Sequence, residues 1–332
     1  MKNFKKAILL LVITLTVLYF VIKDDLPNIL DSLRSANPIF LIIGMGFAFL
    51  YWLFKSFALH GIVNNYKKIK RRSILKQTII TQFFHGVTPF ASGGQPMQIY
   101  MLKKSGLKIA HSTNIIVQNF LLYQMALITH GIIAVLLNFK FDYIVNNILL
   151  RNLTIIGFTI NALVGIGLLI VSFSTTFNTF VLNILIWFFS KFKIFNDKEK
   201  SIEKLRTKLG EFHESATILR QHKIIIFRGY LFNLIGLLCY YLTPLFVFYS
   251  LEINIDPVVV YVCCSYVSII GSFVPIPGGS GGIEYSFLQF FGGFVTGAVL
   301  SATVILWRSI TYYFAMILGG LLFTTFKGVK DK

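Results

Sequence analysis

Two ionisable residues lie within apolar stretches of this sequence, where charged side chains are scarce. Glu284 closes a Pro- and Gly-rich segment at 274–284, and Arg308 lies inside the last apolar stretch. A charge in apolar surroundings is costly, so it usually faces a partner or a cavity. We therefore expect Glu284 and Arg308 to form an ion pair. The pair either only fixes local structure or takes part in binding, since a guanidinium is a bidentate phosphate ligand.

A second set of polar residues lies in the first half of the chain, and its side chains are uncharged. It surrounds another Pro- and Gly-containing segment at 88–96 and continues into the following apolar stretch, with Thr88, Gln95, Gln98, Gln118 and Asn119. Amides in such stretches hydrogen-bond to neighbouring helices or to a ligand. The glycines of both segments, whose backbone N–H groups are potential donors, complete the predicted substrate-binding set: Gly93, Gly94, Gly278, Gly279, Gly281 and Gly282.

Other polar residues in apolar stretches are expected to have structural roles. His85 and His130 are interpreted as buried histidines with satisfied hydrogen bonds, and Lys55 as a side chain that extends to the membrane interface. The three cysteines have neither metal-site nor disulfide spacing. No nucleophile elbow, phosphate-binding loop or zinc motif is present, so the sequence predicts no catalytic residue, cofactor or metal.

The two Pro- and Gly-rich segments indicate which elements position these residues. Pro and Gly interrupt helices, and both segments lie between strongly apolar flanks. The chain is 55% hydrophobic and 13% charged, whereas a soluble domain carries roughly 25% charged residues. The sequence therefore predicts an all-α polytopic membrane protein. Within a membrane, broken backbone is tolerated only against protein or a water-filled cavity.

The net charge of +18 comes from Lys and Arg in short runs between apolar stretches. This distribution is typical of the positive-inside rule and does not indicate nucleic-acid binding. One basic run, at 67–76, precedes the break at 88–96, and another, at 103–108, follows it. Because both runs favour the cytoplasmic side, residues 74–108 are predicted to form a re-entrant hairpin.

The same reasoning divides a single domain, 1–332, into two halves. The first half, 1–173, contains the hairpin 74–108, and a basic cytoplasmic linker at 191–223 follows. The second half, 224–326, contains a hairpin at 257–296 that opens to the outside. Both termini are expected in the cytoplasm. About six full spans and two hairpins then form an inverted-topology repeat, the spans being 7–22, 39–59, 112–137, 153–173, 224–249 and 297–326.

The residues at the two breaks resemble those of a known family. Thr88-Pro-x-x-x-Gly-Gly-Gln-Pro96, Pro277-Gly-Gly-x-Gly-Gly-x-Glu284 and Trp307-Arg308 are similar to the lysyl-phosphatidylglycerol synthase transmembrane-region family. This region is the flippase-like domain of the multiple peptide resistance factor, and it also occurs as stand-alone membrane proteins. The resemblance covers nearly the whole chain. It departs at Gln95 and Gln98, where the family usually has Glu and Arg.

The resemblance implies a lipid transporter of the bacterial inner membrane. In fused members this region is held to move aminoacylated phospholipid to the outer leaflet, while a soluble C-terminal domain performs the aminoacyl transfer. The sequence ends at Lys332, so we expect a stand-alone member without that domain. Its substrate would be a membrane phospholipid, such as lysyl-phosphatidylglycerol, or a polyprenyl-linked lipid. The alternatives are a phosphatidylglycerol lysyltransferase-type enzyme, or a membrane partner of a soluble synthase or glycosyltransferase.

Overall fold

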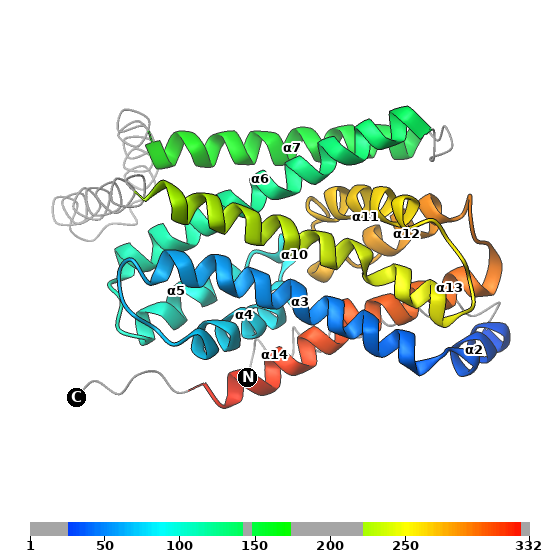
Figure 1. The fold of residues 1–332 in the computed structure, drawn as a ribbon, viewed down its shortest axis with the longest axis horizontal. Helices are drawn as coiled ribbons and strands as arrows, with labels where there is room; N and C mark the ends of the chain where they lie inside the picture. Colours follow the sequence, from blue (N-terminus) through cyan, green and yellow to red (C-terminus); the bar gives the residue numbers. More distant parts are fainter. Residues whose placement is uncertain (1–25, 142–147, 174–221, 327–332) are drawn as a thin grey trace, which may run out of the picture.

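The computed structural model describes residues 26–141, 148–173 and 222–326, and its regular structure in these ranges is entirely helical. The predicted span at 7–22, residues 191–221 of the basic linker and the last six residues lie outside the described residues. Most of the long helices run along one direction (Figure 1): α3 (Pro38–Val63), α6 (Ile109–Phe141), α7 (Ile148–Phe173) and α10 (Lys223–Ser250).

Five apolar segments among the described residues are long enough to cross a membrane: Pro38–Val63, Ile109–Phe139, Ile148–Gly167, Lys223–Ser250 and Gly297–Thr324. Each coincides with a span expected from the sequence. The last one is formed by α13 (Gly297–Arg308), a π-helical turn (Ser309–Tyr313) and α14 (Phe314–Thr324). The protein is thus an all-α polytopic membrane protein, as predicted.

Helices α3 and α10 pack against each other through the centre of the molecule (Figure 1). Aromatic pairs line their interface: the ring centroids of Phe47 and Phe246 are 4.5 Å apart, and those of Tyr51 and Tyr240 are 5.0 Å apart. Gly236 allows the close approach, because a Cβ there would lie 3.3 Å from Cβ of Phe54. This central pair carries several of the residues that line the cavity described below.

The first predicted hairpin is formed by α4 (Arg71–Gly86) and α5 (Gly94–Lys104), joined by a 3₁₀ turn at Pro89–Ala91. Phe90 and Ala91 have positive φ angles of 53° and 51°, so the chain reverses sharply there. The ring of His85 packs directly against Gly94, where an added Cβ would overlap it. The break therefore depends on a glycine at position 94 as well as on Pro89.

The second hairpin is formed by α11 (Pro257–Gly271) and α12 (Gly282–Phe291), joined by a 3₁₀ turn at Pro277–Gly279. Gly278, Gly279 and Gly281 have positive φ angles of 64°, 63° and 84°, a region that glycine enters without strain. The returning helix ends at Phe291, earlier than the sequence suggested, because two glycines follow at 292 and 293.

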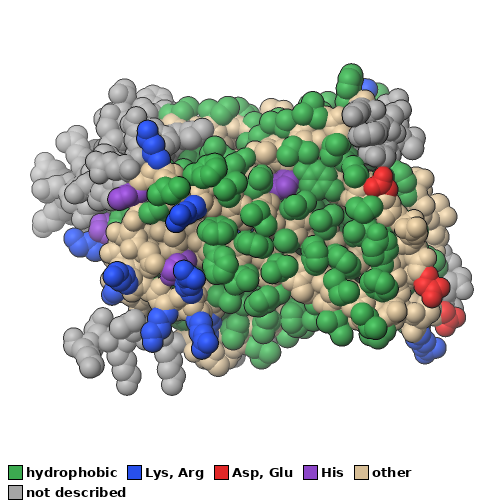
Figure 2. Space-filling model, viewed as in Figure 1, with side chains coloured by type: hydrophobic (Ala, Val, Ile, Leu, Met, Phe, Trp, Pro, Cys, Tyr) green, Lys and Arg blue, Asp and Glu red, His purple; other side chains and the backbone are tan. Residues whose placement is uncertain are grey.

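The two hairpins lie toward opposite ends of the molecule, and their breaks meet in the interior (Figure 1). Figure 2 shows hydrophobic side chains around the middle, most Lys and Arg side chains at one end, and the Asp and Glu side chains at the other. The first hairpin begins at Arg71 and ends at Lys104, whereas Asp256 caps the start of the second. This charge distribution favours opposite openings for the hairpins, and the inverted repeat stays a prediction.

Candidate functional site

A cavity of about 350 Å³ lies where the two breaks meet. Residues of both hairpins and of α3, α6, α7, α10 and α13 line it, so distant parts of the chain contribute to one space. Its polar lining includes side chains from several of these elements, among them Lys55, Gln82, His85, Gln95, Gln98, Asn119, Tyr123, Asn161 and Arg308. A polar cavity enclosed by apolar helices is a candidate ligand site.

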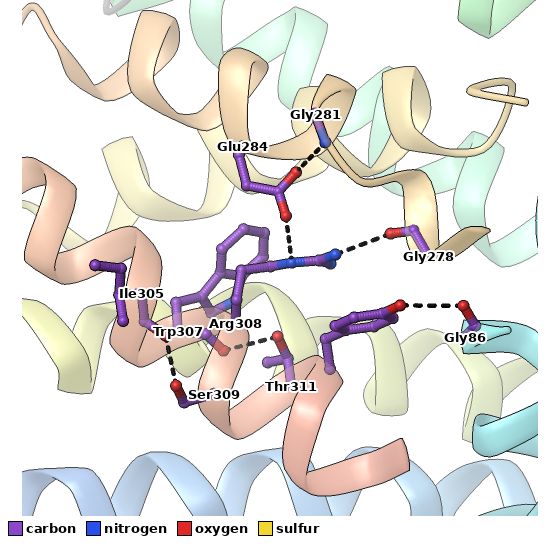
Figure 3. Close-up of polar contacts among 10 residues, drawn as sticks. Gly86, Gly278, Gly281, Glu284, Ile305, Trp307, Arg308, Ser309 and Thr311 are labelled. Atoms are coloured by element: carbon purple, nitrogen blue, oxygen red, sulfur yellow. Dashed lines mark hydrogen bonds and ion pairs between the residues drawn. The ribbon is translucent and has the colours of Figure 1, made fainter. Parts of the chain in front are cut away.

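The expected ion pair between Glu284 and Arg308 is confirmed (Figure 3). Nε of Arg308 lies 2.8 Å from Oε1 of Glu284, and the two side chains are only 3% and 12% exposed. The other carboxylate oxygen accepts a hydrogen bond from the backbone N–H of Gly281 at 2.7 Å. Nη2 of Arg308 donates to the carbonyl oxygen of Gly278 at 3.0 Å. Arg308 and Glu284 thus each hydrogen-bond to the backbone of the glycine turn in the second hairpin, at Gly278 and Gly281 respectively.

Tyr312 covers the guanidinium and links it to the first hairpin. Cζ of Arg308 lies 4.1 Å from the centroid of the Tyr312 ring, within cation–π range. The hydroxyl of Tyr312 donates to the carbonyl oxygen of Gly86 at 3.0 Å (Figure 3). The same ring fills the space next to Gly278 that a side chain there would need. Tyr312 therefore contacts both hairpins at their meeting point.

A π-helical turn, Ser309–Tyr313, directly follows Arg308. Such turns are rare and are found frequently at functional sites. Here Ser309 and Thr311 donate side-chain hydrogen bonds to the carbonyl oxygens of Ile305 and Trp307, each at 2.8 Å (Figure 3). Bonds of this kind often bend a helix, and Arg308 and Tyr312, on either side of this turn's first residues, both line the cavity. The sequence predicted an unbroken span at 297–326.

Three of the predicted amide residues line the cavity: Gln95, Gln98 and Asn119. The buried side-chain oxygens of Gln95 and Asn119 have no hydrogen-bond partner in the described part of the chain. Gln118 is buried away from the cavity lining. An unsatisfied buried acceptor costs free energy, and because these two oxygens have almost no accessible surface, each would accept a hydrogen bond from a ligand once its side chain turns into the cavity.

The predicted glycines and Thr88 have mainly structural roles in this geometry. Gly278 and Gly279 line the cavity, whereas Gly93, Gly94, Gly281, Gly282 and Thr88 do not. The N–H of Gly93 donates to the Thr88 hydroxyl at 2.8 Å, and that of Gly279 donates to the Ile276 carbonyl at 2.8 Å. With the Gly281 N–H held by Glu284, these three donors are already used within the hairpins.

His130 is buried with the hydrogen-bond partners expected of such a histidine, whereas His85 is only partly buried and lines the cavity. Nδ1 of His85 lies 2.6 Å from the carbonyl oxygen of Ala91, which joins the two sides of the first break. Nδ1 of His130 lies 2.7 Å from the Tyr261 hydroxyl, and its Nε2 lies 2.9 Å from the carbonyl oxygen of Leu234. His130 is therefore satisfied at both ring nitrogens.

Lys55 is the cavity residue that the sequence analysis misplaced. Its ammonium does not extend to the interface but lines the cavity. Nζ donates to the Tyr51 hydroxyl at 3.2 Å and lies 5.1 Å and 4.9 Å from the ring centroids of Tyr51 and Tyr123. Lys55 is the one Lys or Arg within the predicted span 39–59, which could have marked it as a candidate functional residue. The neighbours that its side chain faces could not be predicted from that span alone.

Comparisons with known proteins agree with this architecture. A family model described as lysylphosphatidylglycerol synthase TM region matches residues 7–319. A protein of Archaeoglobus fulgidus described as a UPF0104 membrane protein is 23% identical over an alignment of 320 residues that covers 87% of each chain. The family match extends across the two hairpins and the ion pair.

Proposed function

The chain belongs to the lysylphosphatidylglycerol synthase TM region family of membrane proteins, and on this premise we propose that it transports a lipid between membrane leaflets. The observation that carries the proposal is the polar cavity at the meeting point of two broken helical hairpins. Discontinuous helices that meet inside a membrane protein are typical of transport sites. The proposal assigns no chemical step to this chain.

In the proposed mechanism, the headgroup enters the cavity while the acyl or prenyl tails remain in the bilayer. Lys55, Gln95, Asn119 and Gly278 line the space that receives the headgroup. Because each hairpin contributes to the lining, a small movement of one hairpin against the other changes which end of the cavity is open. Tyr312, which contacts both hairpins, lies where that movement occurs.

We place the protein in the bacterial inner membrane, with the Lys- and Arg-rich end of Figure 2 in the cytoplasm. The substrate in this proposal is a phospholipid or a polyprenyl-linked lipid. Arg308 and Glu284 keep the second hairpin in the shape that forms one wall of the cavity. In this proposal, the ion pair affects transport by maintaining the shape of that wall.

A leaflet-exchange assay tests the proposal directly. Purified protein is reconstituted into vesicles that contain a fluorescent phosphatidylglycerol, and a membrane-impermeant reductant destroys the label in the outer leaflet. We expect a protein-dependent loss of the inner-leaflet signal, because translocation brings those lipids to the outside. A loss no faster than in protein-free vesicles, for phosphatidylglycerol, its lysyl ester and a polyprenyl phosphate alike, would contradict the proposal.

A matched pair of variants on α6 tests whether the route passes through the cavity. Asn119 lines the cavity, whereas Met125 is 41% exposed on the outer surface of the same helix. Asn119→Phe places a large apolar ring in the path of the headgroup and should slow exchange several-fold. Met125→Phe adds a similar ring outside the cavity and should leave the rate unchanged. Equal rates in the two variants would place the route elsewhere.

A further inference from the structure

The cationic groups of the cavity are not equivalent. Lys55 and Arg308 are the two basic Lys or Arg side chains that line it, and no Asp or Glu of the described chain does so. Arg308 is neutralised by Glu284 at 2.8 Å, whereas Lys55 has no carboxylate within ion-pair distance in the described ranges. In its protonated form, Lys55 therefore gives the cavity a net positive charge.

The hydrogen-bond geometry of the two cations leads to the same distinction. Arg308 directs Nε to Glu284 and Nη2 to the carbonyl of Gly278, and one face of its guanidinium is covered by Tyr312. Lys55 has three N–H donors and uses one of them, toward the Tyr51 hydroxyl at 3.2 Å. The rings of Tyr51 and Tyr123 hold its ammonium by cation–π contacts, which leave its charge in place.

The remaining polar groups of the cavity indicate which kind of headgroup fits beside an anion bound at Lys55. Gln95 and Asn119 line the cavity, and their side-chain oxygens are buried and have no hydrogen-bond partner among the described residues. A rotation of either amide into the cavity would let its oxygen accept a hydrogen bond from a hydroxyl group. A cationic amine is a poorer match, because a net positive cavity without a lining carboxylate repels it.

We propose that Lys55 binds the phosphate of an anionic lipid, and that the cavity selects a neutral, hydroxyl-bearing headgroup such as glycerol or a sugar over an aminoacylated one. This inference rests on the proposed transport function, whose cavity it specifies. Arg308 is then a positioning residue for the second hairpin, and Lys55 contacts the substrate. The shared ligand chemistry is a lipid phosphate, either a diester with a glycerol headgroup or a polyprenyl-linked one.

Equilibrium binding to the full-length protein in detergent tests the inference without any transport step. The probes are short-chain phosphatidylglycerol, its lysyl ester, a short polyprenyl phosphate and inorganic phosphate. We expect phosphatidylglycerol to bind at least roughly tenfold more tightly than the lysyl ester, about the effect of one charge-assisted contact. A lysyl ester that binds equally or more tightly would overturn the inference, and this wild-type comparison needs no variant to fold.

The other two probes identify the kind of phosphate that is bound. Binding of the polyprenyl phosphate identifies the lipid class, and competition by inorganic phosphate alone would show a free-anion site instead of a headgroup site.

Three lysine variants locate the contact. Lys55→Met keeps the length of the side chain but removes the charge, and it should weaken phosphatidylglycerol binding roughly tenfold or more. Lys55→Arg should retain most of the affinity. Lys104, an exposed lysine whose Nζ lies 5.9 Å from the Tyr100 ring centroid, is the matched control, and Lys104→Met should bind like the wild type. Unchanged binding in a folded Lys55→Met protein would refute the role of Lys55.

Comparison with the leaflet-exchange assay separates the two proposals. Selective binding that depends on Lys55, without protein-dependent exchange, would reject transport and leave the anion site intact. Exchange that occurs at the same rate in Lys55→Met and in the wild type would reject the anion site and leave transport intact. Melting temperatures measured in the same detergent show whether each variant is folded.

Discussion

The hydroxyl of Tyr312 donates a 3.0 Å hydrogen bond to the carbonyl oxygen of Gly86, which joins the last span to the first hairpin. The ring of Tyr312 also lies under Arg308 and fills the space next to Gly278 in the second hairpin. One side chain therefore connects both halves of the chain at the place where their helices are broken. Any relative movement of the hairpins has to change the surroundings of Tyr312.

Removing this hydroxyl should destabilise the protein measurably. Tyr312→Phe leaves the carbonyl oxygen of Gly86 without its partner, at an expected cost of about 1–3 kcal/mol in the free energy of unfolding. The neighbouring Tyr313 is the control, because its hydroxyl is buried and has no partner in the described ranges. Tyr313→Phe should be neutral or slightly stabilising. Reversible unfolding in mixed micelles measures both, and similar losses would contradict the role of the hydrogen bond.

The sequence allowed the main features of this site to be predicted because they follow from local rules. Pro89 and the glycines at 278–282 interrupt helices wherever they occur, and the basic runs at 67–76 and 103–108 favour the same side of a membrane. The pairing of Glu284 with Arg308 followed from the cost of two isolated charges in apolar stretches.

Features that depend on the contacts between distant helices were missed. Lys55 lies near the end of its predicted span, so an extended side chain at the interface was a reasonable expectation. Its true position depends on Tyr51 one turn earlier and on Tyr123 from α6, whose rings surround the ammonium. The π-helical turn at Ser309–Tyr313 likewise has no periodic signature, because it inserts into an otherwise uniform apolar helix.

The close packing at Gly94 makes a sharp steric prediction for the first break. A Cβ at this position would overlap the His85 ring, so Gly94→Ala should destabilise the protein by about 1–3 kcal/mol. Gly46 in α3 has nothing within 4 Å of the same added atom, and Gly46→Ala should be neutral or stabilise by up to about 1 kcal/mol. Thermal unfolding of the two proteins in the same detergent compares them. Equal melting temperatures would show that the break accommodates the methyl group.

The predicted opposite openings of the hairpins can be tested by labelling with an impermeant thiol reagent. The native cysteines are buried, so single cysteines can be added at exposed sites flanking each hairpin: Arg72 and Lys104 for the first, Asn254 and Thr296 for the second. The first pair should react only in inverted vesicles, and the second pair should react in intact cells. Labelling of positions 72 and 104 from opposite sides would eliminate the re-entrant hairpin.

The ion pair between Glu284 and Arg308 gives the last prediction. Removing one partner leaves a buried charge unpaired, at a cost of roughly 3–5 kcal/mol. Glu284→Gln and Arg308→Gln should therefore each lower the melting temperature, and each should slow leaflet exchange, because the wall formed by the Gly278 turn is lost. Arg228→Gln, at an exposed position of α10, controls for the loss of a positive charge.

The double variant then distinguishes a positioning role from a direct one. With both charges removed, no lone buried charge remains, and the two losses should be less than additive. If the pair only positions the hairpin, Glu284→Gln/Arg308→Gln should recover both stability and leaflet exchange. Recovery of stability without exchange would mean that Arg308 contacts the lipid itself. Strictly additive losses in both measurements would show that the two side chains are not coupled, in conflict with the 2.8 Å contact.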